Sequence, residues 1–364
     1  MLIKSTTSPL RLRMQFLRAR ESGDPFAFRF EPQDYILPTA GGGSPSACFQ
    51  WTPAFLSDLQ AVRRPGRDPA VVQRVGEALR HFVQDAGWAS LEPEISQALA
   101  ADRPVFVTIR SSAAELYALP WELLAMRSTG QSLGALPGVF IRYEWPQTST
   151  AADSGPRSEE ERILFAWSAA GGAVPAAEQL RALRGAAQNS LHPFDPERDV
   201  LAHMSSRRLA AALTAASQER KPIAVLHLLC HGQGVGSTFG LCVDADEETA
   251  ASVVLDAAQL RQLLTPHART LRLVVLCACD SGNSGALGNQ LGSVAQALHR
   301  AGIAAVVASR YPLSSAGSLR LSEALYETLL VQLDSLESAL VLARQRLAED
   351  VAQMDWASLQ IYAR

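Results

Sequence analysis

Long, uninterrupted apolar runs dominate the second half of the chain. They fall at residues 162–169, 222–230, 270–278 and 303–310. Continuous apolar runs of this length are typical of strands that are buried on both faces. The segments between them carry apolar residues at helical spacing, as in 289–302. Buried strands alternating with helices predict an α/β domain, with a mainly parallel sheet flanked by helices on both faces.

The first half has a different pattern. Leu10, Leu12, Met14 and Phe16 alternate with polar residues, which predicts a half-buried strand. Residues 26–31 alternate in the same way after a turn-like segment, so we expect a hairpin. Three helical segments and two strands are also expected, at 53–63, 69–84, 92–100, 104–110 and 138–144. This half is therefore predicted to be an α+β subdomain.

A polar segment separates the two halves. Residues 146–161 are rich in Ser, Thr, Pro and charge, which is typical of a linker. We therefore expect an N-terminal subdomain over 1–145 and the α/β domain over 162–364. The motif LPWELL at 119–124 is expected to pack the first against the second.

Composition excludes several classes of function. The net charge of -3 gives no electrostatic case for binding nucleic acid or a membrane. No apolar run approaches the roughly 18 residues of a membrane helix. The five cysteines form an odd set without a signal peptide, so we expect free thiols in a cytoplasmic protein. No motif indicates a cofactor.

Two reactive side chains follow two of the predicted strands. His231 and Gly232 come directly after the run 222–230, and Cys279 follows 270–278. Ligands and chemistry collect at the carboxyl ends of parallel strands. A histidine there can take the thiol proton, and the resulting thiolate can attack a carbonyl carbon. The backbone N–H groups of Gly232 and Cys279 are candidates for an oxyanion hole.

Two other interpretations use the same residues. Both side chains can be ordinary core residues, since free Cys is often buried. Alternatively, His227 and His231 with Cys277 and Cys279 have the ligand types of a zinc site, although the C-x-C spacing is not the usual C-x2-C. The residue pattern alone leaves these alternatives open. We favour a supporting role for His227 behind the dyad and core positions for the remaining cysteines of this half, Cys230, Cys242 and Cys277.

The segments HLLCHG and VVLCACDSG, with their His and Cys 48 residues apart, resemble the CHAT family of caspase-like cysteine proteases. Their clan relatives include caspases and separase. The resemblance extends over roughly 104–362 and includes LPWELL, AGIAAVVASRYPLSS and the C-terminal segment. One departure is Asp280, where the family usually has Glu.

The resemblance implies a caspase-like sheet and a cysteine endopeptidase that makes limited, regulated cuts in a protein partner. It makes His231 the base and Cys279 the nucleophile, without metal or cofactor. Bacterial defence or programmed cell death is the implied setting, and an activating partner protein is a further expectation. The competing hypothesis is an inactive caspase-like scaffold that binds a protein.

Charged residues near the predicted site suggest a specificity. Asp280 follows the nucleophile, and Asp244 and Asp246 lie in the loop after another short strand. An acidic lining favours Arg or Lys at P1, the residue before the cut, as the resemblance to separase also suggests. Arg310, after the last buried strand, would reverse the preference if it reached the site. The alternative is that 244–248 is simply a solvated loop.

Overall fold

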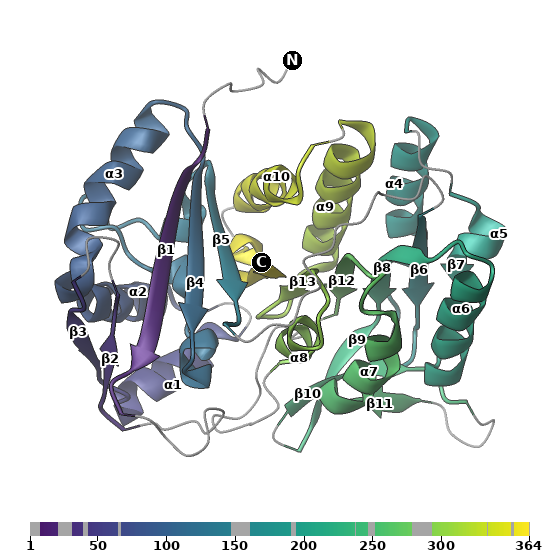
Figure 1. Cartoon of the computed structure of the whole chain (residues 1–364), viewed down its shortest axis with the longest axis horizontal. Helices are drawn as coiled ribbons and strands as arrows, with labels where there is room; N and C mark the ends of the chain where they lie inside the picture. The colour runs from purple at the N-terminus through teal and green to yellow at the C-terminus, as the bar shows by residue number, and fades with distance from the viewer. Residues whose placement is uncertain are drawn as a thin grey trace.

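The computed structural model describes most of the chain. The described residues are 8–20, 31–38, 43–64, 67–146, 161–190, 194–236, 238–246, 252–278, 293–332, 334–350 and 353–363. Their centre is an eleven-stranded sheet in the order β3-β2-β1-β4-β5-β14-β13-β12-β8-β6-β7 (Figure 1). Its strands are β1 Leu10–Arg18, β2 Gln33–Ile36, β3 Ser46–Phe49, β4 Val105–Ser111, β5 Val139–Glu144, β6 Arg162–Trp167, β7 Val200–Leu201, β8 Ile223–Leu229, β12 Leu273–Cys277, β13 Ala305–Ser309 and β14 Leu359–Ala363. A smaller sheet has the order β11-β10-β9, formed by β9 His231–Val235, β10 Thr238–Val243 and β11 Val253–Leu255.

The large sheet contains two parallel blocks that run in opposite directions. Strands β1, β4, β5 and β14 form one block, and β13, β12, β8, β6 and β7 form the other. The blocks meet where β13 pairs antiparallel with β14. The predicted mainly parallel sheet is therefore confirmed, with antiparallel pairing at this junction and at β1, β2 and β3.

Helices cover both faces of the sheet. They are α1 Pro53–Val62, α2 Pro69–Val83, α3 Ala89–Ala100, α4 Ala176–Gln188, α5 Pro196–Asp199, α6 Ser206–Gln218, α7 Ala257–Leu264, α8 Val294–Arg300, α9 Ser315–Tyr326, α10 Leu336–Ala348 and α11 Asp355–Ser358. One core joins side chains of α4, α9 and α10 to Phe165, Val275 and Val307. The other joins α6, α7 and α8 to Leu228 and Leu276. Neighbouring residues of a strand, such as Val275 and Leu276 of β12, therefore enter different cores, because side chains alternate between the two faces of a sheet.

The N-terminal strand forms as its alternation predicts. Leu12, Met14 and Phe16 of β1 are buried. Its antiparallel neighbour is β2, and its other neighbour, β4, is parallel. The expected second hairpin strand at 26–31 falls almost entirely within 21–30, outside the described residues.

Several elements differ from the sequence-based expectations. The sequence pattern predicts a mostly helical segment over 197–218, but β7 interrupts it, and His203 has a φ of 52°. Asp334, with Glu337 three residues on, predicts a capping box at the start of α10, but the cap is Ser335, whose hydroxyl accepts from the backbone N–H of Ser338. The sequence pattern predicts two closing helices and no strand after them, but β14 follows and enters the middle of the sheet. LPWELL forms the short 3-10 turn Trp121–Leu123.

The two halves share one sheet. Strand β14 pairs with β5 through Tyr362 and Tyr143, across the expected boundary. The Tyr143 hydroxyl donates to the buried Glu122 carboxylate of LPWELL at 2.8 Å, and the Trp121 indole N–H donates to Leu116 O at 2.8 Å. The expected linker lies largely within 147–160, outside the described residues. LPWELL thus packs at the junction of the two halves.

Candidate active site

Three parallel strands end side by side at one edge of the sheet. Leu229 at the end of β8 is paired with Trp167 of β6 and with Cys277 of β12. The pairing extends further, since the N–H of Cys230 donates to the carbonyl of Cys277 at 3.4 Å. His231 is two residues beyond Leu229, and Cys279 is two residues beyond Cys277. The two reactive residues therefore follow matched positions on adjacent strands.

The His231 imidazole rests on the loop after β6. Its Nε2 is 3.2 Å from the carbonyl oxygen of Ala173. Because a carbonyl only accepts, Nε2–H is the donor, and the neutral ring keeps its lone pair on Nδ1. Nδ1 is thus the nitrogen that can take a proton.

Two glycines make room for this ring. Gly171 and Gly172 have φ angles of 85° and 145°. A Cβ on Gly172 would lie 3.1 Å from His231 Nε2, and one on Gly171 would lie 3.2 Å from the Cys242 sulfur. Sequence reasoning missed this loop. The feature that marks it in the sequence is a glycine pair soon after a buried strand, at the edge of the sheet where sites form.

The residue that precedes the predicted nucleophile is buried and hydrogen-bonded. Cys279 and Asp280 belong to 279–292 and lie outside the described residues. The residue before them, Ala278, is buried, and its carbonyl accepts from the Ser309 hydroxyl at 2.8 Å. Gly232, the second candidate oxyanion donor, lies in β9 opposite Leu241.

His227 belongs to a buried hydrogen-bond network beneath this edge. Its Nε2 is 2.8 Å from Gln179 Oε1 of α4, and its Nδ1 is 2.7 Å from the Tyr326 hydroxyl of α9. The Gln179 amide nitrogen donates to the Ser318 hydroxyl at 3.1 Å. Burial lowers the pKa of His227 to about 3, so the ring is neutral. With Nε2–H donating to the amide oxygen, Nδ1 accepts from Tyr326.

His227 is therefore not available as a zinc ligand, because both of its ring nitrogens form hydrogen bonds. This contradicts the zinc alternative for that residue. Among the described residues, no group of three or more His, Cys, Asp or Glu side chains is arranged to hold a metal. Gln179 and Tyr326 were missed by sequence reasoning, since they come from helices distant along the chain.

The described cysteines of this region are core residues. Cys230, Cys242 and Cys277 are buried. Burial raises the pKa of Cys277 to about 12, against smaller opposing contributions from hydrogen bonds with Ser322 and Gln179. A thiol with so high a pKa is a poor nucleophile at neutral pH. Cys48, by contrast, is exposed.

The two described acidic residues of the predicted specificity loop have different surroundings. Asp244 accepts from the Ser168 hydroxyl at 2.6 Å. Ser168 comes three residues before Gly171, so Asp244 lies near the glycine loop that contacts the His231 ring. Asp246 instead accepts from the hydroxyls of Ser205 and Ser206 at the start of α6. Hydrogen bonds, that from Ser205 first, lower the pKa of Asp246. Asp246 thus stabilises a helix end.

Arg310 does not extend toward solvent. It is 3% exposed, and its NH1 donates to the carbonyls of Tyr117 and Ala118, both at 3.0 Å. Its NH2 donates to the Tyr143 hydroxyl at 3.0 Å. The idea that Arg310 reaches a substrate carboxylate is therefore corrected, because the side chain turns into the junction between the two halves.

The neutral state of His227 predicts a pH effect on stability. Between pH 6.5 and about 3 the unfolded chain binds a proton at His227 that the folded chain does not. The free energy of unfolding should therefore fall with falling pH, by up to about 1.4 kcal/mol per unit from this residue. Urea unfolding of the wild type and of His227→Gln at pH 7 and pH 4.5 measures it. We expect a smaller difference between the two proteins at pH 4.5, and equal pH slopes would contradict the assignment.

No helix in the described part of the chain combines the length and apolar character needed to cross a membrane.

Comparison with known proteins gives one family match. The model described as CHAT domain matches residues 83–364. No curated protein matches the sequence.

Solved structures resemble the chain only distantly. The Saccharomyces cerevisiae separase–securin complex has a TM-score of 0.43 and 11% identity, over 71% of this chain and 15% of that one. A secreted C11 cysteine protease from Bacteroides thetaiotaomicron, in complex with an irreversible peptide inhibitor, has a TM-score of 0.36 and 10% identity, over 52% and 59%. A structure described as a protease has a TM-score of 0.43 and 11% identity, over 98% and 78%. The chain thus spans a small part of separase.

Proposed function

The chain belongs to the CHAT domain family, and from this premise we propose that it is a cysteine endopeptidase with Cys279 as nucleophile and His231 as base. The observation that carries the proposal is the hydrogen bond of the His231 ring. Its Nε2–H donates to the Ala173 carbonyl, which leaves Nδ1 as the proton acceptor, and His231 follows β8, whose neighbour β12 leads to Cys279.

The proposed chemistry has two stages. Nδ1 of His231 takes the proton of the Cys279 thiol, and the thiolate attacks the carbonyl carbon of the scissile peptide bond. The imidazolium then gives its proton to the leaving amine, and water hydrolyses the thioester. The Ala173 carbonyl stabilises the imidazolium, because it accepts a hydrogen bond from Nε2–H of His231. The N–H groups of Gly232 and Cys279 are the proposed oxyanion donors.

His227 is proposed to act as a positioning residue, together with Gln179. The Gln179 amide contacts β8 through His227, and it also hydrogen-bonds with Cys277 of β12. The backbone N–H of Gln179 donates to the carbonyl of Pro175 at 3.1 Å, at the end of the loop whose Ala173 carbonyl accepts from His231. A neutral, fully bonded network of this kind can keep three strand ends in register without taking part in proton transfer.

The proposed specificity is for Arg or Lys at P1. Asp244, near the His231 loop, and Asp280, next to the nucleophile in sequence, are the proposed acidic groups. Asp246 and Arg310 are left out because their side chains are bonded elsewhere.

The test is a search for new protein N-termini in a cell extract. We expect wild-type protein to generate a limited set that Cys279→Ala does not, with Arg or Lys before most cuts. A partner captured without any cutting would favour the inactive scaffold. Efficient cutting after Asp, and none after Arg or Lys, would contradict the specificity and leave the dyad standing.

Gly172→Ala is expected to lower kcat by about 10- to 100-fold, because misplacement of a catalytic group by about 1 Å can cost that much. The added Cβ would lie 3.1 Å from His231 Nε2, at a backbone φ of 145° that L-residues rarely adopt. Steady-state kinetics on a substrate of the wild type measures the loss.

The matched control for this variant is Gly185→Ala. Gly185 is in α4, and nothing lies within 4 Å of its added Cβ. It should keep kcat and gain roughly 0.5–1 kcal/mol of stability. Unchanged kcat in Gly172→Ala would show that the ring does not need this loop.

A further inference from the structure

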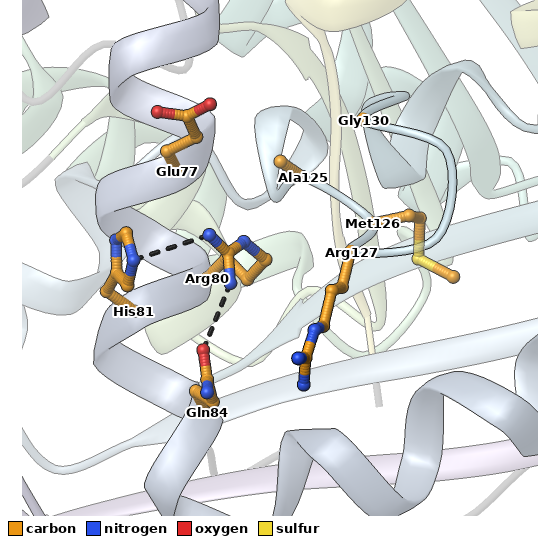
Figure 2. Close-up of a pocket in the computed structure, with 8 residues that line it drawn as sticks. All are labelled: Glu77, Arg80, His81, Gln84, Ala125, Met126, Arg127 and Gly130. Atoms are coloured by element: carbon orange, nitrogen blue, oxygen red, sulfur yellow. Dashed lines mark hydrogen bonds between the residues drawn. The ribbon is translucent and has the colours of Figure 1, made fainter.

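A groove on the N-terminal side of the molecule has no role in the proposed catalysis. It consists of two adjoining hollows of about 470 and 530 Å³ that share Arg80, Gln84 and Arg127. In the first hollow one wall is the end of α2 and the other is the turn 125–130 (Figure 2), and in the second hollow α3 continues the helical wall. Helices α2 and α3 lie on the opposite side of the molecule from β6 and β8 (Figure 1).

The helical wall is interrupted where the two hollows meet. Residues Gln84–Trp88 form a π-helical turn between α2 and α3, with Gly87 at a φ of 98°. Such single wide turns occur frequently at functional sites. The turn brings Gln84 and Trp88 to the lining of the same groove.

Two guanidinium groups line the groove without a carboxylate partner among the described residues. Arg80 donates to Gln84 Oε1 at 3.0 Å and lies 3.3 Å from His81 Nε2, and neither of these partners is a carboxylate (Figure 2). Arg127 is exposed and makes no ion pair or hydrogen bond with any described side chain. Both cations are therefore free to pair with an anion.

The two described carboxylates of the lining are held by other donors. Glu77 accepts from Gln73 Nε2 at 3.0 Å. Glu92 accepts from the backbone N–H of Ser128 at 3.0 Å, which fixes the turn that carries Arg127. The turn is closed further by Met126 N–H donating to Gln131 O at 2.8 Å. Arg127 thus extends from a rigid support.

A third donor in the lining is unsatisfied. Trp88 is 2% exposed, and its indole Nε1 has no hydrogen-bond partner among the residues that the structure describes. A buried indole N–H usually has an acceptor, so its absence here calls for an explanation. Next to Trp88, the groove is lined by the apolar surfaces of Ala89 and Pro93.

We propose that this groove binds an acidic peptide segment of a partner protein. Arg80 and Arg127 would pair with its carboxylates, and Arg is suited to this because its planar fork matches a carboxylate. Trp88 would supply a further donor, and the apolar wall would take a neighbouring apolar side chain. This site does not depend on the proposed peptidase activity.

The test uses a fluorescein-labelled octapeptide of alternating Glu and Leu, with a Gln-for-Glu peptide as its neutral counterpart. Fluorescence anisotropy of the full chain should show tighter binding of the acidic peptide. Arg127→Gln and Arg80→Gln should each weaken it by roughly threefold to fivefold, because each removes one Arg–carboxylate pair at a partly or fully exposed position. Trp88→Phe, which keeps an aromatic ring without the N–H, should weaken it less.

Arg74→Gln is the matched control. Arg74 is in the same helix, but its guanidinium is bonded to Asp58 at 2.6 and 2.9 Å. It should change affinity by less than about twofold, because Arg74 does not line the groove and its charge is already paired with Asp58. Equal losses in Arg74→Gln and Arg127→Gln would overturn the site in favour of general charge attraction. Binding of citrate in the groove without any peptide preference would overturn the peptide assignment.

Discussion

Replacing either Cys279 or His231 with alanine is expected to lower kcat/KM by roughly four orders of magnitude, while the fold stays intact. The two residues act as one unit, so the double variant should be about as inactive as either single variant. The strand ends that lead to both residues are paired, and the His231 ring has a single nitrogen left for the thiol proton. Kinetics on a peptide chosen from the wild-type cleavage sites measures the loss.

The control for this prediction is Cys230→Ala. Cys230 directly precedes His231, but its side chain is buried. Its activity should stay close to that of the wild type. If His231→Ala kept most of its activity, the base would have to be a different group.

Arg310→Met is expected to destabilise the protein by about 3–5 kcal/mol, because removal of a buried, bonded charge leaves its partners unsatisfied. The carbonyls of Tyr117 and Ala118 and the Tyr143 hydroxyl would each lose a donor. The same hydroxyl also donates to buried Glu122, so the network between the halves would be disrupted. Urea unfolding measures the change.

Arg346→Met serves as the comparison, since Arg346 pairs with Glu327 near the surface. A change of 0–1 kcal/mol is expected there. A stable Arg310→Met protein with a new P1 preference would restore Arg310 as a substrate-binding residue.

Elements with a strong local pattern could be predicted from the sequence. The four apolar runs of the second half form β6, β8, β12 and β13. The alternation of Leu12, Met14 and Phe16 predicted β1. These patterns are local consequences of burying one or both faces of a strand. The CHAT resemblance, recognised from two short motifs, is also confirmed.

The pairing of distant segments could not be predicted in this way. Strand β14 is short, and only its partners β5 and β13 make it central in the sheet. Arg310 directly follows a buried strand, as a site residue often does, yet its side chain bonds to groups almost 200 positions earlier. The same limit hid the role of Gln179, since a helix pattern does not tell which strand its polar residue contacts.

The most direct test of the central claim is the site and rate of thiol modification. In a Cys48→Ser background, the other described cysteines are buried. A thiol-reactive probe mapped by mass spectrometry should then modify Cys279, and His231→Ala should slow that reaction by at least about tenfold at neutral pH, because the thiolate loses its partner. Modification of Cys279 at the same rate with and without His231, or no modification of Cys279 in an otherwise reactive protein, would contradict the Cys279–His231 dyad.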